Sequence, residues 1–165
     1  MKIRRIKSAD KESFIKLWDT IYAEGCYLQK PPPSDDIIER VIHKVEERTL
    51  PNFVAVDNHR VVANVEVFPG SMSGIEREHA DQIGILGIQI HQNYREQGLG
   101  RKLMRMALDD SRRHGFKEIE LHVFSSNQRA INLYQSLGFI YQHDSGEEQL
   151  PNGEKVISQC MRLSL

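Results

Sequence analysis

The chain has 165 residues, a length that suits one domain with a single substantial core rather than two domains. Hydrophobic residues make up 39% of it and charged residues 27%, which argues against a disordered or fibrous protein. Its 22 basic and 23 acidic residues nearly cancel, so the chain lacks the positive field that supports nonspecific nucleic-acid binding. We therefore expect one domain, residues 1–165, that does not bind nucleic acid.

The cysteines and the hydropathy pattern predict the compartment. Cys26 and Cys160 lie far apart, so no C-x-x-C spacing indicates a zinc site or a redox pair. The basic start is followed by Lys7 and Asp10 rather than by the apolar core of a signal peptide. No apolar run approaches the roughly 20 residues of a membrane helix. We expect a reduced, cytoplasmic protein that uses no metal and no membrane.

The first half of the chain predicts a strand, two helices and a hairpin. A short strand over 3–6 precedes a helix whose apolar residues recur at helical spacing over 14–22. Three prolines follow, and a second amphipathic helix is predicted over 34–45. Alternating apolar residues over 53–67, interrupted by a turn at Asp57-Asn58, predict an antiparallel hairpin.

The segment from Gln82 to Ile90 has an irregular apolar pattern. Apolar residues at 83 and 85 are followed by apolar residues at 86, 88 and 90, so the alternation slips by one position. Beside Gly84 and Gly87, such a slip indicates a β-bulge that interrupts strand pairing. A strand that is buried on both faces would produce the same pattern, and both interpretations stay open.

The second half predicts two helices and three strands. An amphipathic helix is expected over 99–114, a strand over 119–123 and another helix over 130–137. Two last strands, over 139–142 and 155–163, flank a turn. This mixture of helices and strands predicts an α/β (α+β) fold.

The turn that joins the irregular strand to the next helix has the sequence Arg95-Glu96-Gln97-Gly98-Leu99-Gly100-Arg101-Lys102. A helix N-terminus presents unpaired N–H groups and the positive end of the helix dipole, and glycine lets an anion approach the backbone closely. Arg95, Arg101 and Lys102 add positive charge. The turn is therefore a candidate phosphate-binding site.

Two other nucleotide-binding motifs also place glycines before a helix. A dinucleotide-binding turn requires a third glycine where this chain has Leu103, although Glu118 or Glu120 falls near the ribose-binding spacing. A P-loop is excluded because no Gly-Lys-Ser/Thr sequence is present. A nucleotide-dependent enzyme stays as an alternative, as does a helix that merely begins after a glycine turn.

Short motifs occur in a characteristic order and spacing between Ile85 and Tyr141: Leu86-Gly87-Ile88, Tyr94-Arg95, Gly98-Leu99-Gly100, Leu121-His122-Val123, Asn127, Ala130-Ile131, Leu133-Tyr134 and Gly138-Phe139. Together they resemble the GNAT superfamily of acetyl-CoA-dependent N-acetyltransferases. The resemblance implies a mixed central sheet of about seven strands with a bulged, splayed strand pair, flanked by about four helices. It also implies a homodimer, since the family often forms homodimers.

The same resemblance implies acetyl-CoA as cosubstrate. The pantetheine arm would pair with the strand backbone at Ile88–Ile90, and the pyrophosphate would rest on the amides of Gln97–Lys102. Asn127 matches a position that contacts the cofactor arm, although it is equally suited to cap a helix. The implied cofactor-binding residues are Ile88, Gln89, Ile90, Arg95, Gln97, Gly98, Leu99, Gly100, Arg101, Lys102, Asn127 and Tyr134.

Acetyl transfer requires a proton donor, a base and donors for an oxyanion. Tyr134 matches the family tyrosine near the cofactor sulfur, where a phenol can protonate the leaving thiolate; an aromatic residue on a helix can also be simple core. His122, twelve residues earlier, matches a glutamate proposed as base, and imidazole suits that role. Asp81 and Glu66 are the alternative bases, and the backbone N–H near Ile88 is the candidate oxyanion donor.

The acceptor is predicted from the resemblance alone. The chain looks most similar to small bacterial enzymes that acetylate free amino acids or related small amines, for which His79-Ala80-Asp81 and Asn152-Gly153-Glu154 are examples of shared sequence. A small-molecule amine is therefore the expected acceptor. The alternatives are a protein N-terminus, a polyamine, an aminoglycoside, or a noncatalytic domain that senses acyl-CoA.

Overall fold

Seven strands form one mixed sheet in the computed structural model, which describes residues 1–165. Their order is β1-β2-β3-β4-β5-β7-β6, and only the β4–β5 pairing is parallel. The strands are β1 (Lys2–Arg5), β2 (Asn52–Asp57), β3 (Arg60–Pro69), β4 (Ile83–Ile90), β5 (Glu118–Phe124), β6 (Ile140–Gln149) and β7 (Lys155–Ser164). The helices are α1 (Lys11–Ala23), α2 (Asp35–Arg48), α3 (Leu99–His114) and α4 (Gln128–Ser136). Both the seven strands and the four helices confirm the predicted fold.

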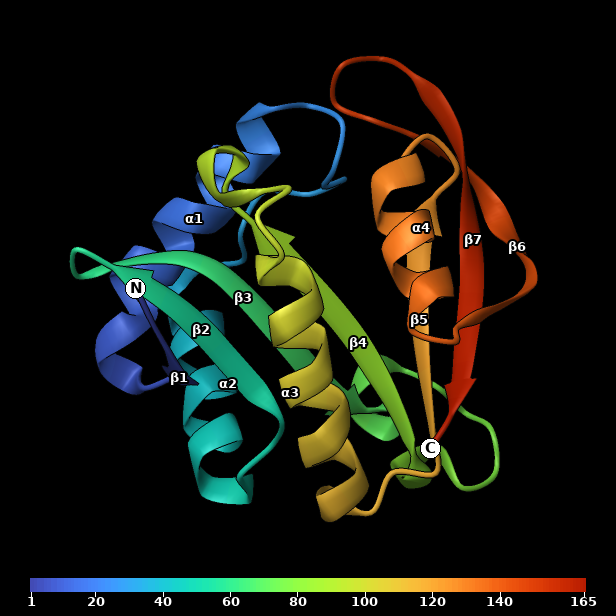
Figure 1. Cartoon of the computed structure of the whole chain (residues 1–165), viewed down its shortest axis with the longest axis horizontal. Coiled ribbons are helices and arrows are strands. Elements are labelled where there is room, and N and C mark those ends of the chain that lie inside the picture. The colour runs from blue at the N-terminus through green and yellow to red at the C-terminus, as the bar shows by residue number, and fades with distance from the viewer.

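Helices cover both faces of the sheet (Figure 1). One face packs against α3 and α4 through a core of 20 buried residues that includes Leu103, Ile119 and Tyr134. The other face packs against α1 and α2 through a core of 10 buried residues that includes Leu17 and Ile42. No helix has both the length and the apolar character that a membrane span requires.

Strand β4 departs from β5 partway along its length. The two strands pair only from Ile83 to Ile85 on β4, opposite 118–120 on β5, so the rest of β4 diverges from its neighbour. The predicted splay is therefore present. The predicted bulge within β4 is wrong, because its register against β3 runs without a shift from Gly84 to Ile90. Successive residues at the start of β4, such as Ile83 and Gly84, are buried because both faces are covered there, and this explains the irregular apolar pattern.

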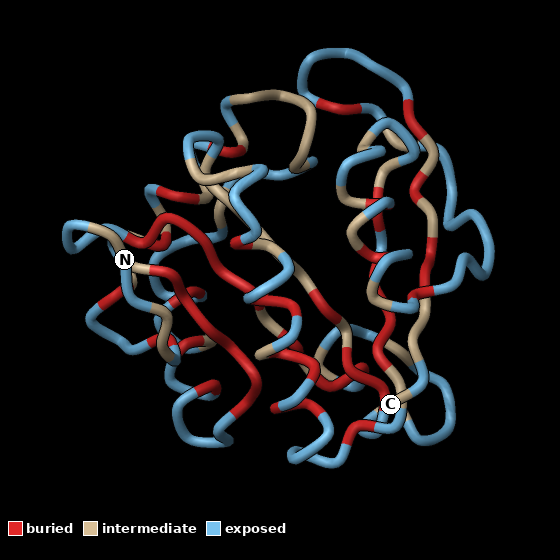
Figure 2. The backbone as a smooth tube through the Cα atoms, viewed as in Figure 1, coloured by how far each residue is buried: buried red, intermediate tan, exposed pale blue.

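The last hairpin is longer than its sequence indicates. The first of its strands was expected over 139–142, whereas β6 extends from Ile140 to Gln149. Figure 2 shows buried backbone in the strands at the centre of the sheet and an exposed β6 at its edge. The pairing with β7 also shifts register twice. A strand that is exposed on both faces needs no apolar alternation, so the pattern ended before the strand did.

Candidate active site

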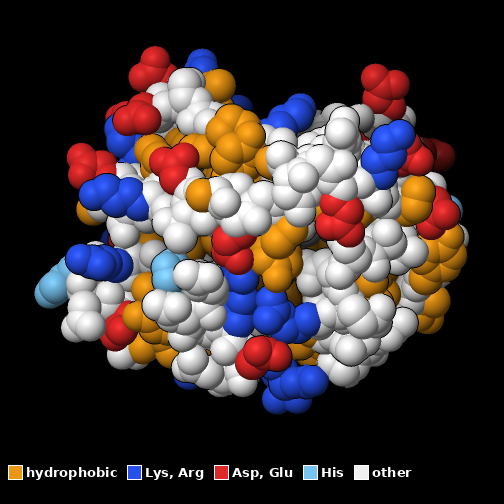
Figure 3. All heavy atoms as spheres, turned by 90° about the horizontal axis from the view of Figure 1, so that it is seen from above, with side chains coloured by type: hydrophobic (Ala, Val, Ile, Leu, Met, Phe, Trp, Pro, Cys, Tyr) orange, Lys and Arg blue, Asp and Glu red, His pale blue; other side chains and the backbone are white.

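A cavity of about 310 Å³ lies at the end of the sheet where β4 and β5 diverge. Figure 3 looks down on this end of the molecule, where hydrophobic side chains and Lys or Arg side chains adjoin near the centre of the face. Its walls come from α1 and the loop after it, from β4, from the turn before α3, and from α4. The lining residues are Ile21, Tyr27, Leu28, Ile88, Gln89, Ile90, Arg95, Glu96, Gly98, Gly100, Arg101, Asn127, Arg129, Ala130, Leu133 and Tyr134.

The N-terminus of α3 opens into this cavity with its backbone amides free. Gly98 is the N-cap, its φ of 78° lies in the left-handed region, and no side chain caps the helix. The first amide that finds a helical carbonyl is that of Lys102, which donates to the Gly98 carbonyl at 3.1 Å. A Cβ on Gly100 would lie 3.2 Å from side-chain atoms of Ile90 and Leu133, so glycine lets these two side chains pack closely against the start of the helix. The sixteen-residue helix therefore presents an anion site at the cavity.

Arg95 is not the free cation that its place in the turn suggested. Its guanidinium binds both carboxylate oxygens of Glu24, at 2.5 and 2.6 Å, and its Nε donates to the Ile90 carbonyl at 2.8 Å. It also lies 4.6 Å above the ring of Tyr27. Arg95 thus ties the end of α1 and its following loop to β4, with its charge already neutralised.

The other residues predicted in the turn divide into two groups. Gly98, Gly100 and Arg101 line the cavity, and Arg101 donates to Ser136 Oγ at 2.8 Å. Gln97, Leu99 and Lys102 lie outside the cavity lining, and the Lys102 amide is already bonded to the Gly98 carbonyl.

Tyr134 lies in the cavity wall and is only 6% exposed. Its ring packs 5.9 Å from that of Phe139, and burial raises the pKa of its hydroxyl, which therefore stays protonated at neutral pH. Asn127 also lines the cavity, and its Oδ1 accepts from the Ala130 amide at 3.3 Å, so it caps α4 as well. Gln89 adds a buried Oε1 without a hydrogen-bond partner.

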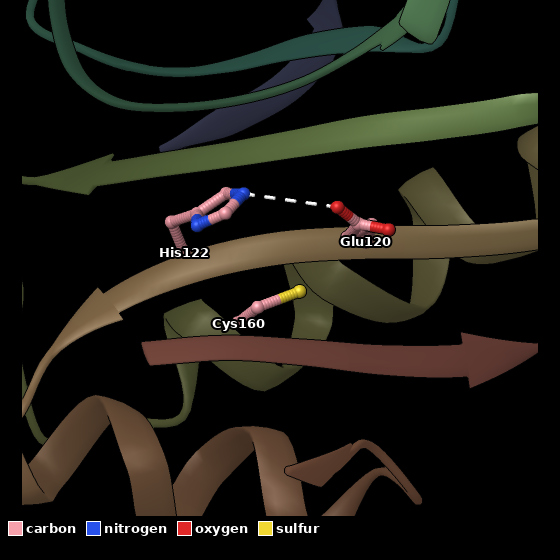
Figure 4. A group of neighbouring side chains, drawn as sticks. All are labelled: Glu120, His122 and Cys160. Atoms are coloured by element: carbon pink, nitrogen blue, oxygen red, sulfur yellow. Dashed lines mark ion pairs between the residues drawn. The ribbon is translucent and has the colours of Figure 1, made fainter. Parts of the chain in front are cut away.

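His122 lies on β5 but does not line the cavity that contains Tyr134. Its side chain is 44% exposed, its Nδ1 lies 3.1 Å from Ser145 Oγ, and its Nε2 lies 3.8 Å from Glu120 Oε1. Figure 4 shows the imidazole and the Glu120 carboxylate side by side along β5, with the Cys160 thiol on the adjacent strand.

Glu120, His122 and Cys160 bring three ligand-type atoms within 4.8 Å of one another. However, the Glu120 carboxylate accepts hydrogen bonds from Arg77 at 2.7 Å and from Arg162 at 3.1 Å. Burial raises the pKa of Glu120, but these two guanidinium groups outweigh it and the net shift is downward. Burial also raises the pKa of Cys160 to about 11, so the thiol stays protonated. Glu120 therefore belongs to an ion-pair network with Arg77 and Arg162, and two cations already engage its carboxylate.

The two alternative bases occupy different environments. Asp81 is exposed and accepts a hydrogen bond from Ser71, next to the start of β4 and about 20 Å along the strand from Ile90. Glu66 lies on β3 opposite Gly87, and burial raises its pKa to about 7. It lines a second cavity, between the sheet and helices α1 and α2. Of the three predicted bases, Glu66 is the one whose pKa burial brings to neutrality.

Several cavity residues are not among the predicted catalytic and cofactor-binding residues. Ile21, Tyr27 and Leu28 come from α1 and the loop after it, a loop that the family resemblance associates with the acceptor rather than with acetyl-CoA. Arg129 immediately precedes the Ala130-Ile131 motif, and it spans the cavity mouth: one Nη donates to Tyr27 Oη at 3.1 Å and the other lies 3.8 Å from a Glu96 oxygen. The position of Arg129 beside that motif is the signal by which the sequence could have indicated its place at the cavity.

The sequence of the chain matches a family model described as the acetyltransferase (GNAT) family over residues 12–139. The chain belongs to this family. The match includes α1 to α4 and the turn before α3, and so it contains most of the cavity.

Relatives with known names match shorter segments. The Escherichia coli ribosomal protein bS18-alanine N-acetyltransferase is 39% identical over 59 residues, which span 36% of this chain and 40% of that protein. The Escherichia coli L-amino acid N-acyltransferase MnaT is 36% identical over 53 residues, 32% of this chain and 31% of that protein. The matched segments thus span well under half of these relatives.

A solved structure matches over the whole length. The yncA protein of Salmonella typhimurium, solved with acetyl-CoA, superposes with a TM-score of 0.86 at 20% identity, covering 100% of this chain and 94% of that one. At this identity the likeness establishes the fold, in agreement with the sheet order and the helix positions.

Proposed function

We propose that this protein transfers an acetyl group from acetyl-CoA to a primary amine of a small molecule, an amino acid or a related amine. The observation that carries the proposal is that the uncapped N-terminus of α3 and Tyr134 line the same cavity. One end of this cavity suits a phosphate, and the other end offers a proton donor. Membership of the acetyltransferase (GNAT) family supports the same activity.

The residues present suit acetyl-CoA, which when bound supplies the acetyl thioester. The free amides of α3 and the cradle at Gly98 and Gly100 would hold the pyrophosphate. The diverging part of β4, Ile88–Ile90, would hold the pantetheine arm, and the unpartnered Gln89 Oε1 can accept a hydrogen bond there. Arg95 would act by positioning, because its pair with Glu24 fixes the loop that closes the cavity.

The proposed reaction moves two protons. The amine nitrogen bonds to the acetyl carbon and the carbon–sulfur bond breaks. Tyr134 donates a proton to the departing thiolate, which its protonated hydroxyl can do. A base takes a proton from the amine; His122 and Glu66 are the candidates, and both lie on the face of the sheet that carries α1 and α2.

A protein N-terminus is the second candidate acceptor. The observation that favours it is the match to the bS18-alanine N-acetyltransferase, whereas the match to MnaT favours amino acids. We favour the small amine, because cavities of about 310 and 180 Å³ have the dimensions of small molecules. A homodimer and a cytoplasmic location stay predictions from the sequence, and sedimentation of the purified chain measures the first.

The test is release of CoA from acetyl-CoA across amino acids, polyamines, aminoglycosides and peptides with free N-termini. Tyr134→Phe and His122→Ala are compared with the parent, and Tyr141→Phe is the matched control because Tyr141 is 50% exposed on β6. Turnover of one amine class that Tyr134→Phe abolishes and Tyr141→Phe retains supports the proposal. Tight acetyl-CoA binding without turnover would favour a sensing domain, and absence of binding would refute the proposed function.

A further inference from the structure

A second cavity, of about 180 Å³, lies between the sheet and the helix pair α1 and α2. Most of its wall is apolar and includes three large aromatic side chains, those of Phe14, Trp18 and Phe68. Its lining residues are Ile6, Phe14, Trp18, Pro33, Ile37, Ile38, Val41, Ile42, Asn52, Glu66 and Phe68. Glu66 is the one ionisable residue among them.

The Glu66 carboxylate has no partner in the chain. No ion pair or hydrogen bond compensates its charge, and desolvation alone acts on its pKa. An unpaired carboxylate within an apolar wall is unfavourable for folding, because its charged form loses water and gains no donor. A bound cation would supply the missing donor. No contact within the fold therefore accounts for a carboxylate at this position.

The two cavities adjoin along one face of the sheet. Glu66 pairs with Gly87 of β4, and Asn64 pairs with Gln89 of the same strand. Because paired residues and residues two apart share a face, Glu66 and Gln89 lie on the same side, in residue pairs that are separated by one other pair, or about 7 Å apart. Gln89 lines the first cavity and Glu66 the second. Gly87 has no side chain to separate them, and a Cβ there would lie 3.4 Å from Glu66 Oε1.

Glu66 thus lies next to the first cavity through Gly87 and Gln89, while it lines the apolar second cavity. An amine that pairs with the Glu66 carboxylate would therefore be near the first cavity, and its carbon substituent could enter the second.

We propose that the second cavity binds the apolar substituent of the acceptor, with the Glu66 carboxylate holding the acceptor ammonium, so that the preferred acceptors are primary amines on an aliphatic or aromatic group. This proposal rests on the proposed function, since it names the substrate class of that reaction. The volume is suitable, because an apolar cavity of about 150 Å³ admits a benzene-sized molecule. The aromatic wall offers the surface that such a group requires.

The test compares acceptors that differ in their substituent: phenethylamine and isoamylamine against ethanolamine and putrescine. Because their apolar groups would be buried, phenethylamine and isoamylamine should have kcat/KM values at least about tenfold higher than ethanolamine and putrescine. Val41→Phe narrows the cavity from α2 and should lower kcat/KM for phenethylamine and isoamylamine about tenfold more than for ethanolamine, so that the preference is lost. Glu66→Gln keeps the shape and removes the charge, and should lower kcat/KM about tenfold or more for every amine. Glu47→Gln is its control, since Glu47 is exposed on α2.

Acetyl-CoA affinity, measured by calorimetry, should be the same in all variants and shows that they are folded. Turnover without a preference for apolar amines, unchanged by Val41→Phe, overturns the cavity proposal and leaves the proposed function standing. Acetyl-CoA binding without turnover of any amine sinks the proposed function instead. In that case a titration of phenethylamine into the protein tests the second cavity. Binding that both Val41→Phe and Glu66→Gln weaken supports the cavity proposal, and absence of binding refutes it.

Discussion

Glu66→Gln should change how stability depends on pH. Burial raises the pKa of Glu66 to about 7, against an ordinary value of 4.5. In the window between these values the folded protein holds a proton that the unfolded chain has released. Stability therefore falls as pH rises from about 4.5 through 7, and the full penalty is present above that range.

The size of the effect on the free energy of unfolding follows from the difference between the ordinary pKa of glutamate, 4.5, and the pKa of about 7 in the folded protein. At about 1.4 kcal/mol per pKa unit this corresponds to about 3 kcal/mol. The value is an upper bound, because Glu66 keeps some access to water through the second cavity. Glutamine fills the same space without a charge. We expect Glu66→Gln to be more stable than the parent by about 1 to 3 kcal/mol at pH 8, and to have nearly the same stability at pH 4.5.

Urea denaturation followed by circular dichroism at pH 4.5, 6 and 8 measures this difference, with Glu47→Gln as the control for removal of an exposed carboxylate on α2. The midpoint of Glu66→Gln should separate from that of the parent as pH rises, and the slope of the transition should stay the same. Equal midpoints at pH 8, or a variant less stable than the parent there, would show that Glu66 has a partner in solution and refute the argument.

Three further changes test the site. Tyr134→Phe should lower kcat by about 100-fold or more through loss of the proton donor, with acetyl-CoA affinity retained in a calorimetric titration; unchanged kcat would exclude this role. Gly100→Val should weaken acetyl-CoA binding about tenfold or more, because its Cβ would lie 3.2 Å from Ile90 and Leu133 side-chain atoms, and affinity equal to that of the parent would contradict the cradle. Arg95→Ala should lower the free energy of unfolding, measured by urea denaturation, by about 2 to 4 kcal/mol, because it leaves Glu24 without its partner. Adding Glu24→Ala in the same chain should recover part of this loss, and a double variant as unstable as Arg95→Ala would contradict the argument.

Elements with a strong period were predictable from sequence. The hairpin around Asp57 and the helix that follows Gly98 both appear where apolar periodicity and glycine placed them. The two errors of detail have a common cause. The strand from Ile140 is exposed on both faces and the start of β4 is buried on both, so in neither case does alternation report the strand's geometry.

For the site, the local motif predicted the N-terminus of α3, because a glycine turn before a helix leaves free amides whatever packs around it. The placement of Tyr134 and Asn127 in the same cavity followed from the order of the family motifs. The ion pair that neutralises Arg95 could not be predicted from the sequence, because its partner Glu24 is 71 residues away in the chain. The same holds for Tyr27, which reaches the cavity mouth from a loop.

Glu66 marks the boundary between the two kinds of information. The sequence contains 23 acidic residues and offers Glu66 as one of three candidate bases, but the ordinary alternation of its strand does not show that its carboxylate is buried. Only the packing of α1 and α2 over β3 removes most of its water and places it in a cavity with aromatic side chains. Local sequence determined the elements and the free amides of α3, because backbone geometry and hydrogen bonding are local; the tertiary structure decided charge pairing, burial and cavity shape, because these depend on residues that only folding brings together.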